Sequence, residues 1–133
     1  MKTRTRIVFA ASAGLSFALT AHFNALWILG FVGLACWSLA LEQTAARRAA
    51  WVSWLVGVSA TLALWHWLPR TVVQFTGLPL AAGFVAWVLF CALSSVPFAI
   101  AGLFSSWARP TVGHPIALAA SVWLMEAWGP HIF

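Results

Sequence analysis

The chain has 133 residues, of which 63% are hydrophobic and 7% are charged, whereas a typical soluble domain carries about 25% charged residues. So few charges cannot cover a folded domain with a polar surface, which excludes an ordinary soluble domain and leaves room for one membrane domain. The formal net charge of +5 would also suit nucleic acid, but the basic residues flank apolar runs. We therefore interpret them as a topology signal and expect no nucleic-acid partner.

The first part of the chain predicts a helical hairpin in the membrane. Residues 1–6 are a basic leader, and an apolar run at 7–21 follows. After a polar break at 22–24, a second apolar run covers 25–41. A basic start before a short apolar core is also typical of a secretory signal peptide, so this alternative stays open, although residues 18–21 make a poor cleavage site.

Residues 51–68 form the central predicted span. These 18 residues carry no formal charge, and as an α-helix they would reach about 27 Å, close to the thickness of bilayer hydrocarbon. Tryptophans lie at both ends, as expected at the two membrane–water interfaces. Small residues every four positions would let another helix approach closely in lipid. Such residues occur at Ser53, Gly57 and Thr61, and in the first run at Ala10, Gly14 and Ala18.

Two further spans are predicted after a loop at 69–77, which Pro69 and Gly77 indicate. The apolar run at 78–107 is about 45 Å long as a straight helix, too long for one upright span. We favour one long helix kinked at Pro97, and two spans that turn near residues 94–97 are the alternative. A loop is predicted at 109–115, where Pro110, Gly113 and Pro115 lie. The last apolar run, 116–128, contains Glu126, and its helix could start at Gly113.

The sequence thus predicts an all-α membrane protein, a polytopic bundle of about five transmembrane helices at 7–21, 25–41, 51–68, 78–107 and 113–128. The N-terminus is predicted in the cytoplasm and the C-terminus on the outer side. Six basic residues then face the cytoplasm and only Arg70 lies outside, which is a strong positive-inside bias. The six are Lys2, Arg4, Arg6, Arg47, Arg48 and Arg109.

Few residues are available for chemistry. The chain has no Asp, one Lys and two acids, Glu42 and Glu126. The predicted topology places these acids on opposite sides of the membrane, so a catalytic carboxylate pair is not expected. Cys36 and Cys91 lie inside apolar runs, where we interpret them as small buried side chains. The four histidines are scattered, so we predict no catalytic, cofactor-binding or metal-binding residues.

Glu126 is the only acid within an apolar run, and a carboxylate at depth costs roughly 3 kcal/mol on insertion scales. The predicted topology places Glu126 near the outer rim, together with His66 and Arg70. An ion pair or hydrogen bond from Glu126 to Arg70 or His66 would tie the last span to the third. A carboxylate that reaches into water is the alternative.

The chain resembles the N-terminal membrane region of apolipoprotein N-acyltransferase, a bacterial enzyme of lipoprotein maturation. The resemblance covers nearly the whole chain, but each of its motifs is loose. It rests on Ala25-Leu26-Trp27, on Trp65-His66-Trp67-Leu68, on Gln74-Phe75-Thr76-Gly77-Leu78-Pro79-Leu80 and on Ala119-Ala120-Ser121-Val122-Trp123-Leu124-Met125-Glu126.

The resemblance implies a multi-pass protein of the bacterial inner membrane, with a periplasmic C-terminus and membrane lipids as partners. A phospholipid acyl donor and an apolipoprotein would be partners through a large nitrilase-like module that this sequence lacks. In the family, the catalytic Glu, Lys and Cys lie on that module, so none can be carried onto this chain. No Arg follows Glu126, and the Phe-Pro-Trp turn usual in the family is also missing.

We therefore predict the membrane part of an apolipoprotein N-acyltransferase-like protein, as a truncated product or fragment that is not catalytic alone. The alternative is a small stand-alone membrane scaffold or accessory subunit without enzymatic activity. The DNA beyond codon 133 would distinguish them, since a continuing frame for a nitrilase-like module favours the acyltransferase.

Overall fold

The structure is a computed structural model that describes residues 3–26 and 28–128, except for the side chains of Asn24, His114 and residues 125–128. Every regular element in this part of the chain is helical, which confirms the predicted all-α class. The elements are α1 (Thr3–His22), the 3₁₀ turn η1 (Asn24–Leu26), α2 (Ile28–Leu41), α3 (Ala46–Leu64), α4 (Leu68–Thr76), α5 (Leu80–Ser94), α6 (Val96–Val112) and α7 (His114–Trp128).

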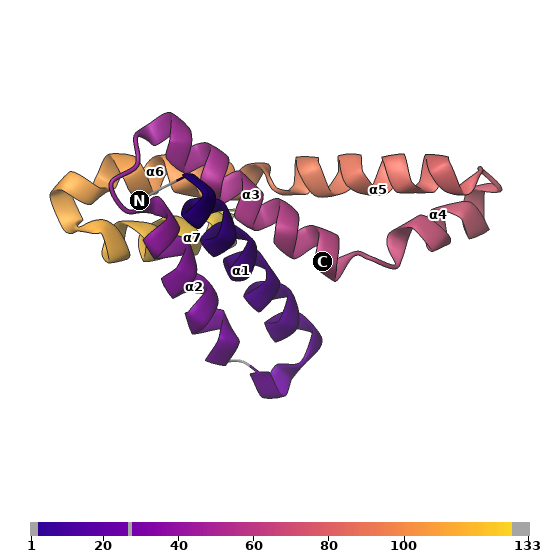
Figure 1. Cartoon of the computed structure of the whole chain (residues 1–133), viewed down its shortest axis with the longest axis horizontal. Coiled ribbons are helices and arrows are strands. Elements are labelled where there is room, and N and C mark those ends of the chain that lie inside the picture. The colour runs from indigo at the N-terminus through magenta and orange to yellow at the C-terminus, as the bar shows by residue number, and fades with distance from the viewer. Residues whose placement is uncertain (1–2, 27, 129–133) are drawn as a thin grey trace.

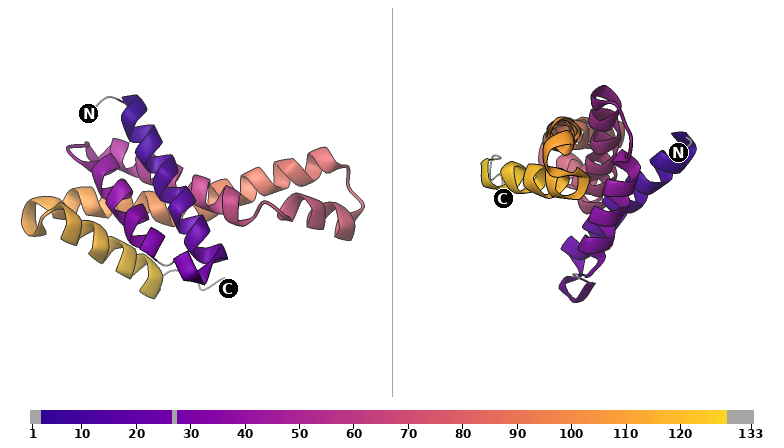
Figure 2. Two further views of the ribbon diagram at one scale, coloured as in Figure 1. Left: turned by 60° about the horizontal axis from the view of Figure 1, so that its bottom comes forward. Right: turned by 90° about the vertical axis from the view of Figure 1, so that its left-hand side faces the viewer.

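The helices form a packed junction and an arm (Figure 1). We call the region where α1, α2, α3, α6 and α7 pack together the junction; α1 packs against α2 and α3, and α6 packs against α3 and α7. Helices α4 and α5 run side by side away from it and form the arm, which Figure 1 and the left view of Figure 2 place outside the junction. The two hairpins, α1–α2 and α6–α7, therefore meet on the central helix α3.

Glycines set the close helix contacts of the junction. A Cβ atom at Gly14 of α1 would lie 2.8 Å from the backbone nitrogen of Ala60 in α3. A Cβ atom at Gly102 of α6 would lie 2.7 Å from the carbonyl oxygen of Ala49, also in α3. Because real Cβ atoms do not approach so closely, only glycine allows these backbones to touch, as the small-residue spacing predicts for the first and third spans.

Trp37 is the largest fully buried side chain of the described residues and lies at the centre of the junction. Its indole nitrogen donates a hydrogen bond of 2.8 Å to the hydroxyl oxygen of Ser53, which joins α2 to α3. The ring also packs edge-on against Phe17 of α1, at 6.2 Å between centroids, and lies 5.7 Å from the ring of Phe98 of α6. The side chain of Trp37, whose N–H is hydrogen-bonded, thus links α2 to α1, α3 and α6.

Much of the outer surface is apolar, because many large hydrophobic side chains are exposed. The stretch Leu80–Val112 is long and apolar enough to cross a membrane, and only 17% of its most apolar window is buried inside the chain. Among the described residues it is one candidate span, and a bent pair of α3 and α4 would be a second. The five-span topology stays a prediction. The exposed side chains include Leu15, Phe31, Val85, Leu93, Ile100, Phe104, Trp107 and Trp123.

The loop predicted at 69–77 is wrong, because residues 68–76 form helix α4. Pro69 lies in the first turn of α4, where a backbone N–H would have no partner within the helix, so proline starts this helix rather than preventing it. The turn comes earlier, at residues 65–67, and bends α4 by 61° from α3. Gly77, with φ of 67°, ends α4 in the left-handed conformation that glycine adopts without strain.

The long apolar run contains two helices, α5 and α6, that meet at Ser95. The Ser95 hydroxyl donates to the carbonyl oxygen of Cys91 at 2.6 Å and lies 3.3 Å from the hydroxyl of Thr61 in α3. Pro97 lies in the first turn of α6, and together the two helices still count as one 33-residue candidate span. The predicted loop at 109–115 is shorter than expected, because α6 continues to Val112 and only Gly113 separates it from α7.

Candidate functional site

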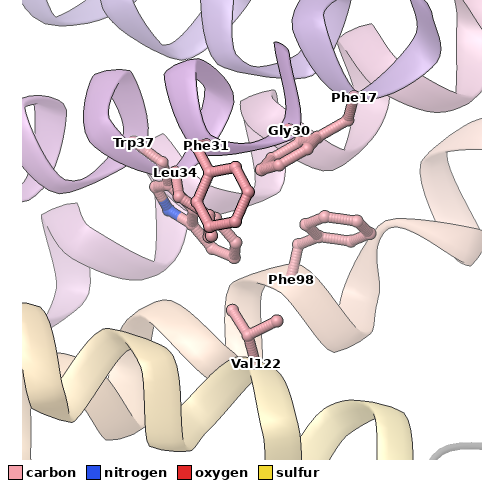
Figure 3. Close-up of a pocket in the computed structure, with 7 residues that line it drawn as sticks. All are labelled: Phe17, Gly30, Phe31, Leu34, Trp37, Phe98 and Val122. Atoms are coloured by element: carbon pink, nitrogen blue, oxygen red, sulfur yellow. The ribbon is translucent and has the colours of Figure 1, made fainter. Parts of the chain in front are cut away.

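An apolar groove lies where the two hairpins of the junction face each other (Figure 3). It encloses about 360 Å³, near the lower end of the range for small-molecule pockets. Helices α1, α2, α6 and α7 all contribute to its wall. The lining residues are Phe17, Gly30, Phe31, Leu34, Trp37, Phe98 and Val122.

Local sequence explains how the groove is built. Phe31 and Leu34 are three residues apart in α2, so they lie on the same face of that helix. Phe31 is exposed, and Figure 3 shows its ring at the groove opposite Phe98. Gly30 leaves room in the wall, because a Cβ atom there would meet only Thr20, at 3.7 Å. The groove is a slot between aromatic rings, open on one side.

The chemistry of the groove is almost entirely apolar. The one polar side-chain atom among its lining residues is the indole nitrogen of Trp37, which already donates its hydrogen to Ser53. Such a wall offers dispersion contacts and the burial of apolar surface, and it offers no general acid, base or nucleophile. It is suited to an aliphatic chain rather than to a polar reacting group.

The polar rim of His66, Arg70 and Glu126 stays a prediction, and the structure describes the surroundings of two of its three side chains. The structure brings His66 and Arg70 to one cavity of about 380 Å³ between the turn at 65–67 and the arm. Both side chains are exposed, and the Nδ1 atom of His66 lies 3.1 Å from the carbonyl oxygen of Ala63. The side chain of Glu126 lies outside the described residues, so its predicted contact with Arg70 or His66 stays a prediction.

Sequence reasoning missed a histidine neighbour on the same rim. The ring of His22, at the end of α1, lies 5.9 Å from the ring of His66, centroid to centroid. The predicted topology contains the necessary signal, since it puts the end of the first span and the end of the third on the same side. The two histidines are 44 positions apart in the sequence, and this distance concealed their proximity.

Basic groups gather at the opposite end of the α1–α2 hairpin. Arg6 is buried, and its Nη2 atom donates to the carbonyl oxygen of Glu42 at 3.2 Å. Arg47 and Arg48, in the first turn of α3, line a cavity of about 630 Å³ together with Trp51. Residues 3–6 of the leader therefore belong to α1, and Arg6 lies beside the loop that precedes Arg47 and Arg48.

No group of three or more His, Cys, Asp or Glu side chains lies close enough to hold a metal ion in the described part of the chain. Cys36 and Cys91 are free thiols; Cys91 is fully buried, as expected from its apolar run, and Cys36 is half-buried. The apolar groove, the cavity lined by His66 and Arg70, and the cavity lined by Arg47 and Arg48 are therefore the features that bear on function.

Comparison with known proteins identifies the family. Residues 13–133 match the family model of the apolipoprotein N-acyltransferase N-terminal domain. A curated relative, an apolipoprotein N-acyltransferase of Bdellovibrio bacteriovorus, is 29% identical over 84 residues. That alignment covers 62% of this chain and 15% of the relative, and no solved structure matches significantly. Because the family model matches most of the length of this chain, the chain belongs to the apolipoprotein N-acyltransferase N-terminal domain family.

Proposed function

We propose that this chain is the membrane-embedded N-terminal part of an enzyme that acylates the amino terminus of lipoproteins with a fatty acyl group from phospholipid. The family match over residues 13–133 carries the proposal. The aligned region is only 15% of the curated relative, so we place the catalytic groups outside this chain and expect no transfer by the chain alone. The chain is a multi-pass protein of the bacterial inner membrane with a cytoplasmic N-terminus.

Within this function, the groove receives an acyl chain of a membrane phospholipid. Its wall is apolar, it is open on one side, and the helices around it carry exposed hydrophobic side chains such as Leu15 and Phe31. These features favour an aliphatic occupant drawn from the surrounding lipid. The membrane part would then hold the donor lipid while a catalytic module removes the acyl group.

Photo-crosslinking tests the groove in the full chain reconstituted in lipid nanodiscs. A phospholipid with a diazirine in one acyl chain is added in trace amount, and adducts are mapped by mass spectrometry. We expect enriched adducts at Phe31 and Leu34, reduced by Gly30→Leu, which fills the slot. Ala81→Leu is the matched control, since Ala81 is exposed on the arm and its substitution leaves the groove open.

Uniform labelling of groove and arm, unchanged by Gly30→Leu, would contradict a lipid site in the groove. The family-level proposal has its own test, in which the purified chain is incubated with phospholipid and a diacylated lipopeptide. We expect no acyl transfer. Turnover by the chain alone would refute the assignment of catalysis to another module. The alternative, a stand-alone scaffold or accessory subunit, is favoured if the gene continues into no catalytic module.

A further inference from the structure

We propose that His22 and His66 form a two-imidazole binding site for a divalent transition-metal ion such as Zn²⁺. His22 is the last residue of α1, and His66 lies in the turn between α3 and α4. Both side chains are exposed, so an ion can reach them from solvent. The site is separate from the groove and goes beyond the proposed function.

The spacing of the two rings fits a shared ion. Their centroids are 5.9 Å apart, and their planes are inclined by 34°. Given a metal–nitrogen bond of about 2.0–2.1 Å, two imidazoles on one ion have centroids about 5 Å apart at a tetrahedral angle and about 6.5 Å apart in a linear arrangement. The observed separation lies within this range, so the ring spacing is compatible with one shared ion.

Each ring also presents the right nitrogen. The Nδ1 atom of His22 lies 3.1 Å from the carbonyl oxygen of Ala18, and that of His66 lies 3.1 Å from the carbonyl oxygen of Ala63. A carbonyl oxygen can only accept a hydrogen bond, so each Nδ1 carries the proton. In the neutral rings the lone pair is then on Nε2. This arrangement is typical of metal-binding histidines, whose second nitrogen donates to a carbonyl or carboxylate.

The surroundings determine which ions the pair prefers. Of the two acids in the sequence, Glu42 follows α2 at the opposite end of the hairpin, and the side chain of Glu126 is not described. Arg70 lines the neighbouring cavity together with His66 and adds positive charge. A site of neutral nitrogens without a described carboxylate selects Zn²⁺, Cu²⁺ or Ni²⁺ over Mg²⁺ and Ca²⁺. Water completes the coordination of the ion.

A bound ion would fasten the end of α1 to the end of α3. These two helices already meet closely at Gly14, and the histidines lie beyond that contact, beside a cavity of about 280 Å³ lined by Ala21, His22, Leu64, Trp65 and Trp67. The ion therefore adds a second fixed point between the helices, next to the start of the arm.

Metal titration of the full chain in nanodiscs tests the proposal. After chelator treatment and dialysis, Zn²⁺ binding is measured by competition with a fluorescent chelator. We expect one saturable ion per chain, at least tenfold weaker binding in His22→Gln and in His66→Gln, and no binding of Mg²⁺. The matched control is His114→Gln, at the start of α7, which should bind Zn²⁺ like the native chain.

Two further measurements keep the test independent of folding defects. His66→Cys should retain Zn²⁺, because a thiolate is also a zinc ligand, whereas His66→Ser should not. With Cu²⁺, electron paramagnetic resonance should detect two imidazole nitrogens in the native chain and one in each glutamine variant. The absence of saturable Zn²⁺ binding, unchanged affinity in both glutamine variants, or a single imidazole on Cu²⁺ in the native chain would overturn the proposal.

Discussion

The junction and the arm have similar apolar compositions but differ in how they are packed. In the junction, glycines bring backbones into contact and a buried tryptophan is held by a hydrogen bond. In the arm, the buried residues of α4 and α5 are Pro69, Gly83 and Cys91, and large side chains such as Val85, Leu89 and Leu93 are exposed. In a chain this apolar, hydrophobicity does not separate core from surface. Small residues at the helix contacts do so.

The largest expected effect is the loss of Trp37 from the junction. Trp37→Ala removes a fully buried ring that contacts Phe17 and Phe98, and it takes away the donor to Ser53. We expect a loss of about 3 kcal/mol in the free energy of unfolding, measured by denaturant titration in detergent. Trp107→Ala is the matched control, because Trp107 is 78% exposed. If both variants lost the same free energy of unfolding, the claim that the junction is packed more tightly than the exposed surface would be contradicted.

A smaller effect is expected for a methyl group at a helix contact. Gly102→Ala places a Cβ atom 2.7 Å from the Ala49 carbonyl oxygen, so α6 must move away from α3, at a cost of about 1–3 kcal/mol. Gly30→Ala is the control, since the nearest atom is 3.7 Å away and alanine favours the helix. Thermal unfolding of both variants in one detergent compares them. A Gly102→Ala variant as stable as the native chain would argue against close packing of α3 and α6.

Sequence patterns predicted the helical class and the close approach of a neighbouring helix at Gly14. They failed at two prolines, because proline occurs both in loops and within helices. Pro69 and Pro110 were interpreted as loop residues. The structure places Pro69 in the first turn of α4 and Pro110 within the last turns of α6. The backbone N–H groups in the first turn of a helix have no partner within the helix, so proline, which lacks this group, is tolerated there. A proline in the sequence therefore does not show whether a loop or a helix start follows. The family was recognised from loose motifs, and the family model confirms it.

The groove could not be predicted from the sequence. Phe31 and Leu34 mark one face of α2, but nothing in the sequence says that this face meets Phe98 of α6. Trp37 stands near the end of an apolar run, a position that suits an interface as well as a core, and the structure buries it fully. Where both faces of a helix carry large apolar side chains, their spacing does not distinguish the packed face from the exposed one.

The predicted contact of Glu126 would connect the two regions, because it joins α7 of the junction to α4 of the arm. A double-mutant cycle on Glu126→Gln and Arg70→Gln measures the coupling by thermal stability in detergent, and a second cycle uses His66→Gln. We expect a coupling energy above about 0.5 kcal/mol for one of the two partners. Additive effects in both cycles would show that Glu126 is a solvated rim residue.

The smallest effect is expected on the exposed face of the arm. Leu93 is 71% exposed, so Leu93→Ala removes few contacts within the chain, and we expect a change within about 0.5 kcal/mol in the free energy of unfolding. The same denaturant titration as for Trp37→Ala measures it. Surface substitutions typically change the free energy of unfolding by about 0.5 kcal/mol or less. A loss of about 2 kcal/mol or more would therefore mean that another part of the molecule covers this face.

The stretch Leu80–Val112 is expected to cross the bilayer, and the membrane function proposed for this chain depends on it. Single spin labels at exposed positions along this stretch, in chains reconstituted in liposomes, report collision with oxygen, which concentrates in lipid, and with a water-soluble nickel chelate. We expect labels at Leu89, Leu93 and Ile100 to collide with oxygen and to be shielded from nickel, and a label at Thr111 near the end of α6 to show the reverse. Nickel collision that is equally high at all four positions would contradict a membrane-embedded chain.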